Sequence, residues 1–200
     1  SGLAYGPVVE EQWGQLGRNV DFFDVKSDLE NLYAPKKLRF IKVVHPTLHP
    51  GRAAQVECDG QIVGVIGELH PRLQQKYELP LAPIVFEVNA QSLQDIALPT
   101  YKETSKFQVV TRDLALVVKN TISVQEIMDI FHKEMKQESA CKIIQAVVLF
   151  DEYRGKGLEQ DEKSLAFRIS LQDTQSTLQD DVVAQAVEAL GNDATKVLGP

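Results

Sequence analysis

Three histidines in the first half of the chain are the first candidates for chemistry, as ligands of a metal ion. His45, His49 and His70 follow one another closely, and Glu68 adds a carboxylate. His45 and His49 each precede a proline, and the residue before a proline is driven out of the helical region. The segment therefore cannot be a helix that presents two imidazoles to one metal ion, as a His-Glu-x-x-His helix does. We interpret these histidines as turn or structural residues and predict no metal site.

A second cluster of functional groups, in the second half of the chain, could recognise RNA. The run Phe150–Arg154 (FDEYR) supplies aromatic rings, carboxylates and a cation within a few residues. Bases of single-stranded RNA stack on aromatic rings, and their edges donate hydrogen bonds to carboxylates. The same residues also fit an ordinary hairpin loop with a surface tyrosine, and the residues alone favour that reading. We expect Phe150 to end a buried strand and Tyr153 to project from the following loop, residues 151–163.

The remaining reactive residues form no recognisable catalytic set. Cys58 and Cys141 have no neighbouring histidine in the sequence and lie outside any Cys-x-x-Cys motif, so a catalytic thiol is not expected. The sequence contains no phosphate-cradling glycine motif and no nucleophilic serine motif. The Gly-bearing segment Arg154–Gly157 is interpreted as a flexible loop, because a phosphate cradle would open a helix.

Composition and charge exclude several classes of protein. Of the 200 residues, 44% are hydrophobic and 24% are charged, and the net charge is −7. A negative chain argues against a clamp that holds nucleic acid by charge alone. No apolar run is long enough to span a membrane, and the first residues do not resemble a signal peptide. The isolated cysteines are typical of a reduced, cytoplasmic protein. The chain begins Ser1-Gly2 like a tag remnant, so we expect it to be a fragment.

The first half of the chain predicts a unit of mixed helices and strands. Asp24 and Ser27 are candidate helix N-caps, and Ser27 with Glu30 fits a capping box. Asp59-Gly60 predicts a tight two-residue hairpin turn. The other elements predicted here are strands at Leu38–Val44, Ala53–Cys58, Ile62–Ile66 and Pro83–Val88, and a short helix at Arg72–Tyr77.

The second half predicts the order β-α-β-β-α-β of a ferredoxin-like unit, which makes the fold class α+β. Ser123 with Glu126 fits a capping box for the first helix, Thr177 is expected to cap the second helix, and Gly191 to end it. The predicted strands are Arg112–Lys119, Ala140–Phe150, Ser164–Leu171 and a short final strand at Ala194–Leu198. Since both alternating sets of side chains in the first of these strands are apolar, we expect it to be buried on both faces.

Several strings of residues connect this chain with a known family. They are VDFFDVKSDLE (Val20–Glu30), HPGRAA (His49–Ala54), GVIGELHP (Gly64–Pro71), SKFQVVTRDLALVV (Ser105–Val118), LFDEYRGKG (Leu149–Gly157), KSLAFRISLQD (Lys163–Asp173) and TLQDDVV (Thr177–Val183). One string alone is not specific, but the ordered set is. Over essentially its whole length, the chain resembles the C-terminal end of the β subunits of bacterial phenylalanyl-tRNA synthetases.

The resemblance implies two units, separated within the polar, Pro-containing stretch Asn89–Thr104. Residues 1–95 resemble part of the catalytic-like domain, a truncated class II synthetase antiparallel sheet domain without an active site. Residues 100–200 resemble the ferredoxin-fold anticodon-binding domain. In this family the α subunit carries the active site and uses ATP and Mg²⁺, within a cytoplasmic (αβ)₂ tetramer. The resemblance thus implies that this chain binds the tRNA(Phe) anticodon loop and the α subunit, holds no cofactor, and is inactive alone.

The resemblance also implies four anticodon-binding residues. Asp151 and Tyr153 match a Phe-Asp-x-Tyr segment whose Asp and Tyr meet the first anticodon base, the Tyr by stacking. Ser164 matches a position close to the anticodon loop. Arg112 matches an arginine that we assign to structural or backbone support.

Three positions depart from the family pattern. Gln108 stands where proline is usual, Thr111 where a second arginine is often found, and Glu152 where the residue is usually apolar. The loss of an arginine and the gain of a glutamate make the site less cationic. The resemblance therefore implies stacking and carboxylate contacts more than strong phosphate contacts.

Two other functions, from different classes, stay open. Amino-acid-binding regulatory modules share the ferredoxin-like topology, and such a module would self-associate and bind free phenylalanine. A metal hydrolase would use His45, His49 and His70, and a purified chain without metal would remove that alternative. Binding experiments with phenylalanine and with an anticodon stem-loop separate the first two functions.

Overall fold

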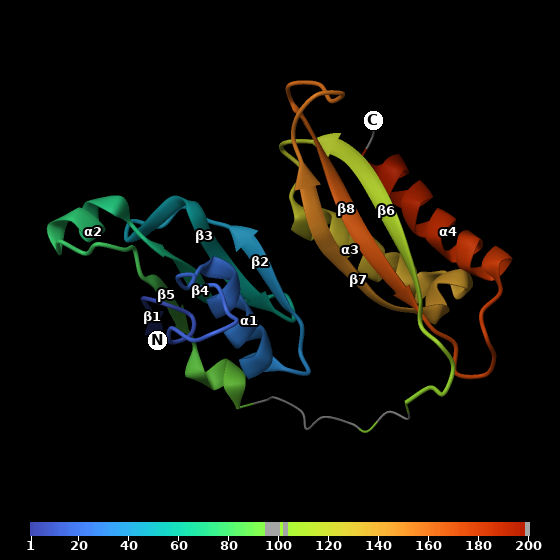
Figure 1. Ribbon diagram of the computed structural model, residues 1–200, viewed down its shortest axis with the longest axis horizontal. Coiled ribbons are helices and arrows are strands. Elements are labelled where there is room, and N and C mark those ends of the chain that lie inside the picture. Colours follow the sequence, from blue (N-terminus) through green and yellow to red (C-terminus); the bar gives the residue numbers. More distant parts are fainter. Residues whose placement is uncertain (95–100, 102–103, 199–200) are drawn as a thin grey trace. The chain divides into compact units, whose positions relative to one another are not determined.

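The computed structural model describes residues 1–94, 101 and 104–198. The chain divides into two compact units, residues 1–101 and 102–200 (Figure 1). The predicted boundary, Asn89–Thr104, lies partly outside the described residues, and its first part forms the short 3-10 helix η1 (Ala90–Leu93).

The first unit is built on a five-stranded antiparallel sheet. Its strand order is β1-β5-β4-β3-β2. The strands are β1 (Gly2–Ala4), β2 (Leu38–Lys42), β3 (Leu48–Cys58), β4 (Gln61–Leu69) and β5 (Ile84–Val88). The turn between β3 and β4 is the predicted one, since Asp59 and Gly60 have φ angles of 50° and 79°. The predicted short helix is α2 (Pro71–Lys76).

Helix α1 (Phe22–Tyr33) begins earlier than predicted. The side chain of Asp21 accepts hydrogen bonds from the backbone N–H groups at the start of the helix, and Asp24 accepts one from Asp21 in return. The capping box is thus formed by two aspartates, and the predicted box of Ser27 and Glu30 is wrong. Both of those residues lie inside the helix, where residues of their type are also tolerated.

Arg18 reinforces this cap from outside the helix. Its guanidinium donates hydrogen bonds to both carboxylate oxygens of Asp24, at 2.7 and 2.6 Å. These bonds, followed by the bond from the Asp21 backbone N–H, lower the pKa of Asp24 to about 2. The lowered pKa means that this contribution to stability is complete above the ordinary aspartate pKa and is lost as the pH falls through about 2.

The core of the first unit lies between α1 and one face of the sheet. The buried residues are Val25, Leu29, Tyr33, Leu38, Ala54, Val56, Cys58, Val63, Ile66 and Ile84. In contrast, the segment that joins β1 to α1 carries two large apolar side chains in the open. Trp13 is 100% exposed and Leu16 is 98% exposed.

The second unit is a three-stranded antiparallel sheet with two helices. The strand order is β6-β8-β7, with β6 (Val110–Lys119), β7 (Ile144–Tyr153) and β8 (Glu162–Leu171). Helices α3 (Val124–Gln137) and α4 (Asp180–Leu198) pack on one face of this sheet (Figure 1). The short 3-10 helix η2 (Ser139–Ile143) leads from α3 into β7. The predicted capping box of Ser123 and Glu126 is confirmed at the start of α3.

The predicted final strand at Ala194–Leu198 is wrong, because α4 continues to Leu198. Gly191 lies inside the helix and does not end it. The helix keeps a buried stripe on both sides of this glycine, made of Val183, Ala186, Leu190 and Ala194. Burial of such a stripe outweighs the cost of a glycine inside a helix, which is about 1 kcal/mol. Helix α4 also starts later than a cap at Thr177 would place it, at Asp180.

Strand β6 is buried on one face only, contrary to the prediction. Leu116 and Val118 are buried under the helices, whereas Ala115 and Val117 are exposed on the other face. Within residues 104–198, no helix or strand covers that second face. We call it the open face of the sheet.

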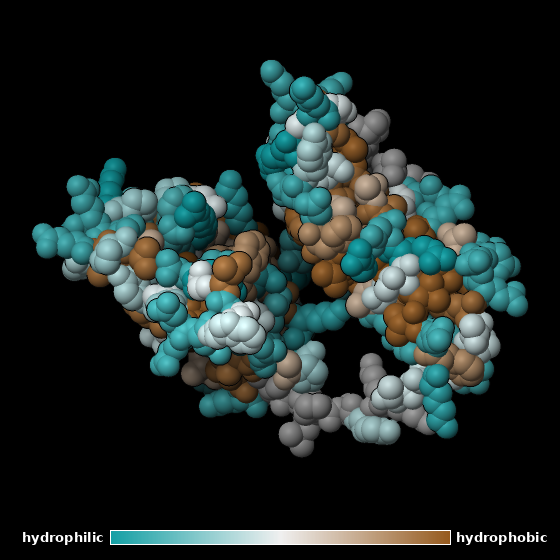
Figure 2. All heavy atoms as spheres, viewed as in Figure 1, coloured by the Kyte–Doolittle hydropathy of each residue, from teal (hydrophilic) through white to brown (hydrophobic). Residues whose placement is uncertain are grey.

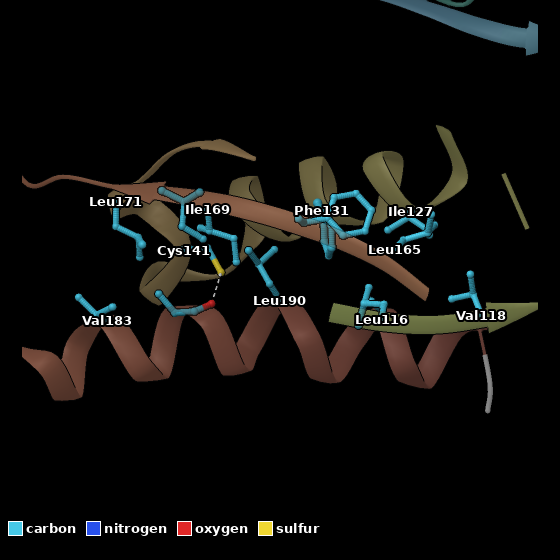
Figure 3. Close-up of a cluster of buried hydrophobic side chains, with 14 residues drawn as sticks. Leu116, Val118, Ile127, Phe131, Cys141, Leu165, Ile169, Leu171, Val183 and Leu190 are labelled. Atoms are coloured by element: carbon cyan, nitrogen blue, oxygen red, sulfur yellow. Dashed lines mark hydrogen bonds between the residues drawn. The ribbon is translucent and has the colours of Figure 1, made fainter. Parts of the chain in front are cut away.

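The core of the second unit is drawn in Figure 3, where side chains from the sheet and both helices converge. Phe131 of α3 meets Phe167 of β8 edge to face, with ring centroids 5.1 Å apart. The Cys141 thiol lies near the backbone carbonyl of Ala186, with 3.9 Å between sulfur and oxygen (Figure 3). Phe150, expected to end a buried strand, is instead 49% exposed.

The two phenylalanines should therefore differ in their effect on stability. Phe167→Ala should lower the free energy of unfolding of the second unit by about 3–5 kcal/mol, because it opens a cavity in the core. Phe150→Ala should cost less, about 1–2 kcal/mol, because its half-exposed ring leaves no closed cavity and loses partial burial and a cation–π contact. The rate at which the buried Cys141 thiol is labelled at increasing urea concentrations measures the free energy of unfolding of both variants. Equal losses from the two variants would contradict this description of the core.

Candidate nucleic-acid interface

The side chains of strand β8 alternate between the face of the sheet that the helices cover and the open face. Its alternate side chains Lys163, Leu165, Phe167, Ile169 and Leu171 are all buried beneath the helices. Successive side chains of a strand point to opposite faces. The intervening side chains on the open face are Ser164, Ala166, Arg168 and Ser170. These small or polar residues form the middle of the candidate surface.

A β-bulge in β7 determines which of its side chains reach the open face. Leu149 pairs with Phe167, yet Asp151, two residues further on, pairs with Ala166, so β7 holds one extra residue there. An extra residue shifts the alternation of the side chains that follow it. As a result Asp151 and Tyr153 lie on the open face, where an unbroken alternation would turn them toward the helices.

Three of the four expected site residues lie together on the open face. Tyr153 pairs with Ser164 on the neighbouring strand, and Asp151 lies one row along, opposite Ala166. Tyr153 is 49% exposed, Asp151 is exposed, and Ser164 is half-buried. All three are on strands, so the expectation that Asp151 and Tyr153 lie in a loop is wrong: β7 ends at Tyr153.

Arg112 is not part of this group. It pairs with Ile169, whose side chain is buried on the covered face, so Arg112 points to the helix side of the sheet. There its Nη2 donates a hydrogen bond to Asp180 at the start of α4, at 3.0 Å. Arg112 thus links β6 to α4, which agrees with a structural assignment.

Gly155, which the sequence indicated only as part of a flexible loop, leaves room for the end of the Tyr153 side chain. A Cβ atom at Gly155 would lie 2.6 Å from the Tyr153 hydroxyl oxygen and 2.8 Å from the ring carbon Cζ. The Tyr153 hydroxyl also donates to the Lys156 carbonyl, at 3.3 Å. The ring is therefore fixed from one side by its own loop. Glycine in the Arg-Gly-Lys-Gly segment is the signal that could have indicated this contact.

A second group on the open face joins all three strands. Arg168 of β8 donates from Nε and Nη2 to the two carboxylate oxygens of Asp113 on β6, each at 2.8 Å. Its guanidinium carbon also lies 4.7 Å from the ring centroid of Phe150 on β7. The hydrogen bonds between the two side chains lower the pKa of Asp113 and raise that of Arg168. Both residues lie in strings shared with the family, but neither was assigned a role from the sequence, because the group depends on cross-strand neighbours.

The loop between β7 and β8 is tied to the end of β6. Lys119 lies 3.2 Å from an oxygen of Asp161 and 3.3 Å from one of Glu162, and hydrogen bonds to these carboxylates raise the pKa of Lys119. The backbone N–H of Asn120 donates to the Asp161 carbonyl at 2.7 Å. Hydrophilic side chains gather at the projecting end of this loop, at the top of Figure 2.

Glu152, near the end of β7, pairs with a cation of its own chain. It accepts a hydrogen bond from Arg154 Nε at 2.6 Å. The cation next to Tyr153 is therefore paired within its own chain. The exposed Tyr153 ring and the exposed Asp151 carboxylate remain as functional groups of the open face.

The three histidines of the first unit have local roles. Nδ1 of His49 accepts from the Gly51 backbone N–H at 3.0 Å, and Nδ1 of His70 accepts from that of Arg72 at 3.1 Å. His45 makes the same kind of contact with Thr47. Among the described residues, no group of three or more His, Cys, Asp or Glu side chains could hold a metal ion.

In the part of the chain that the structure describes, no helix combines the length and the apolar character needed to cross a bilayer.

Comparison with known proteins assigns both units. Residues 1–90 match the model of the phenylalanyl tRNA synthetase beta chain CLM domain, and residues 105–199 match that of the ferredoxin-fold anticodon binding domain. The chain is 54% identical over 202 residues to the phenylalanine–tRNA ligase beta subunit of Burkholderia pseudomallei (strain 1710b). It is 52% identical over 194 residues to that of Cupriavidus pinatubonensis, and 46% identical over 199 residues to that of Aromatoleum aromaticum.

These alignments cover 98%, 95% and 100% of this chain, but only 25%, 24% and 24% of the relatives. The chain thus spans about a quarter of the length of the curated relatives that it matches. Matches of this extent and order confirm the resemblance found in the residues. The chain belongs to the family of phenylalanine–tRNA ligase β subunits.

Proposed function

We propose that the second unit binds the anticodon of tRNA(Phe) on the open face of its sheet. The observation that carries this proposal is the placement of Tyr153, Asp151 and Ser164 side by side on that face, in a domain that matches the anticodon-binding model. Two of these side chains are exposed to solvent and free to meet a nucleotide.

Each of the three residues has a distinct part in this proposal. The Tyr153 ring, held by Gly155, stacks on the first anticodon base. The Asp151 carboxylate accepts hydrogen bonds from the Watson–Crick edge of that base, where a guanine presents N–H donors. The Ser164 hydroxyl, opposite Tyr153 in the sheet, donates to or accepts from the same nucleotide. Arg112 acts at a distance from the RNA, by joining β6 to α4.

The negative charge of the chain favours recognition of RNA by stacking and base contacts over attraction to its phosphates. The net charge of −7 opposes general attraction to RNA. Arg154 and Arg168 are each paired with a carboxylate of this chain. Binding should therefore depend on stacking and base edges, with a modest dependence on salt.

The rest of the enzyme would supply the chemistry. In this proposal the α subunit binds ATP, Mg²⁺ and phenylalanine within an (αβ)₂ tetramer in the cytoplasm, and this chain alone does not activate phenylalanine. The first unit would contribute to assembly with α. Exposed Trp13 and Leu16 support that role, because large apolar side chains in the open often mark protein contacts.

Tyr153→Ala should weaken binding of an anticodon stem-loop to this chain. Stacking of a base on an aromatic ring contributes about 1–3 kcal/mol, which corresponds to a loss of roughly 5- to 150-fold. Tyr153→Phe keeps the ring and should lose far less. Calorimetric titration with the stem-loop measures the affinity of the parent, of Tyr153→Ala and of Tyr153→Phe. Equal binding by Tyr153→Ala and the parent would refute the site, and tight binding of free phenylalanine without RNA binding would favour the regulatory module.

Asp151→Asn should reduce discrimination more than affinity. The substitution keeps the size of the side chain but replaces one acceptor oxygen by a donor nitrogen, which opposes the N–H groups of guanine. The preference for a stem-loop whose first anticodon base is G over one with A there should fall by about 5-fold or more. Ser170→Ala, on the same face but two rows further along, is the matched control. An unchanged preference for G in Asp151→Asn would remove the role of Asp151.

Gly155→Ala should weaken RNA binding without unfolding the unit. The added methyl group collides with the end of the Tyr153 side chain, which is free to move outward, so the free energy of unfolding should change little. The displaced ring should then stack poorly, and we expect a loss of about 3- to 10-fold. In the background of Tyr153→Ala the same substitution should have no effect on binding. An effect of equal size in both backgrounds would show that Gly155 acts without Tyr153.

A further inference from the structure

We infer that Phe150 and Arg168 form a second base-binding platform on the open face, which takes another nucleotide of the anticodon loop. This inference rests on the proposed function of the open face. It adds a subsite for which the family resemblance gives no residues, and it explains why an arginine is stacked and paired at the middle of the sheet.

The geometry of the pair leaves a surface on which a base can stack. The Phe150 ring carries the Arg168 guanidinium at 4.7 Å from its centroid. Phe150 is 49% exposed, and the side chain of Arg168 is 52% exposed. Within residues 104–198, Nη1 of Arg168 has no hydrogen-bond partner, so its N–H groups remain available to a base edge or a sugar oxygen.

Asp113 makes the guanidinium a stacking surface more than a phosphate-binding cation. Its two oxygens hold Nε and Nη2 of Arg168, which fixes the orientation of the guanidinium and neutralises its charge. Guanidinium planes and aromatic rings are both surfaces on which unpaired bases stack. The platform is therefore built from all three strands, and the Arg168 guanidinium is already oriented before a base binds.

The position of the platform suits a neighbouring nucleotide. Arg168 is four residues from Ser164 along β8, which is about 13 Å at the usual rise of a strand. Between the two rows lie the small side chains of Ala115 and Ala166, paired across β6 and β8. A short unpaired run of RNA can cross this shelf, with one base on Tyr153 and another on the platform.

The test compares variants of this chain against anticodon stem-loops with single abasic nucleotides. Phe150→Ala and Arg168→Met should each weaken binding of the intact stem-loop by about 5- to 150-fold. For one stem-loop that lacks a base other than the first anticodon base, Phe150→Ala and Arg168→Met should no longer weaken binding, whereas Tyr153→Ala still should. For the stem-loop that lacks the first anticodon base, Tyr153→Ala should no longer weaken binding, whereas Phe150→Ala and Arg168→Met still should.

Matched controls separate the platform from general effects. Arg52→Met removes an arginine paired with a glutamate in the first unit, and Phe23→Ala removes an exposed phenylalanine of the same unit. Both should bind the stem-loop as the parent does. Protection of the buried Cys141 thiol reports folding, and Phe150→Leu, which keeps apolar bulk without the ring, replaces Phe150→Ala if that variant unfolds.

Two results would overturn the inference. If Phe150→Ala, or Phe150→Leu in its place, and Arg168→Met bind every stem-loop as the parent does while Tyr153→Ala binds weakly, the platform is wrong and the anticodon site stands. If Arg168→Met lowers the slope of log affinity against log salt by about one, Arg168 contacts a phosphate and does not stack. If Tyr153→Ala also has no effect, the proposed function itself fails, which is a separate result.

Discussion

The alternation of side chains along β8 is the constraint on which the second unit depends. Leu165, Phe167, Ile169 and Leu171 are fully buried, so a slip of the strand by one residue would drive Arg168 into the core. Such a burial of an arginine away from its partner is strongly unfavourable. The register of β8 is thereby pinned, and with it the composition of the opposite face. The covered side of the sheet thus decides which groups are offered to a ligand on the open side.

The bulge in β7 adds a second level to this constraint. The strand must keep Leu149 in the core and still present Asp151 and Tyr153 outward, and these demands conflict in a regular strand, where all three share one face. One extra residue resolves the conflict, and Phe150 then joins the open face as well. Within β7, Leu149 thus packs in the core, whereas Asp151 and Tyr153 face the open side of the sheet.

Some features that depend on neighbours in sequence could be predicted, whereas the features that depend on neighbours in space could not. The box of Ser123 with Glu126 and the turn at Asp59-Gly60 are local and were correct. The bulge, the open face of β6 and the continuation of α4 past Gly191 depend on what packs alongside. The site divides in the same way. Asp151, Tyr153 and Ser164 came from a family resemblance, whereas the pairing of Arg168 with Asp113 needed the sheet.

The exposure of Trp13 has a consequence for spectroscopy. The chain has a single tryptophan, and its indole is already in water when the protein is folded. Its emission should therefore change little on unfolding, so a flat tryptophan signal would not mean that the protein lacks structure. Tyr153 is the only tyrosine among residues 105–199. With Trp13 replaced by phenylalanine, the phenol emission of the second unit would come from a single ring, the one that stands on the open face.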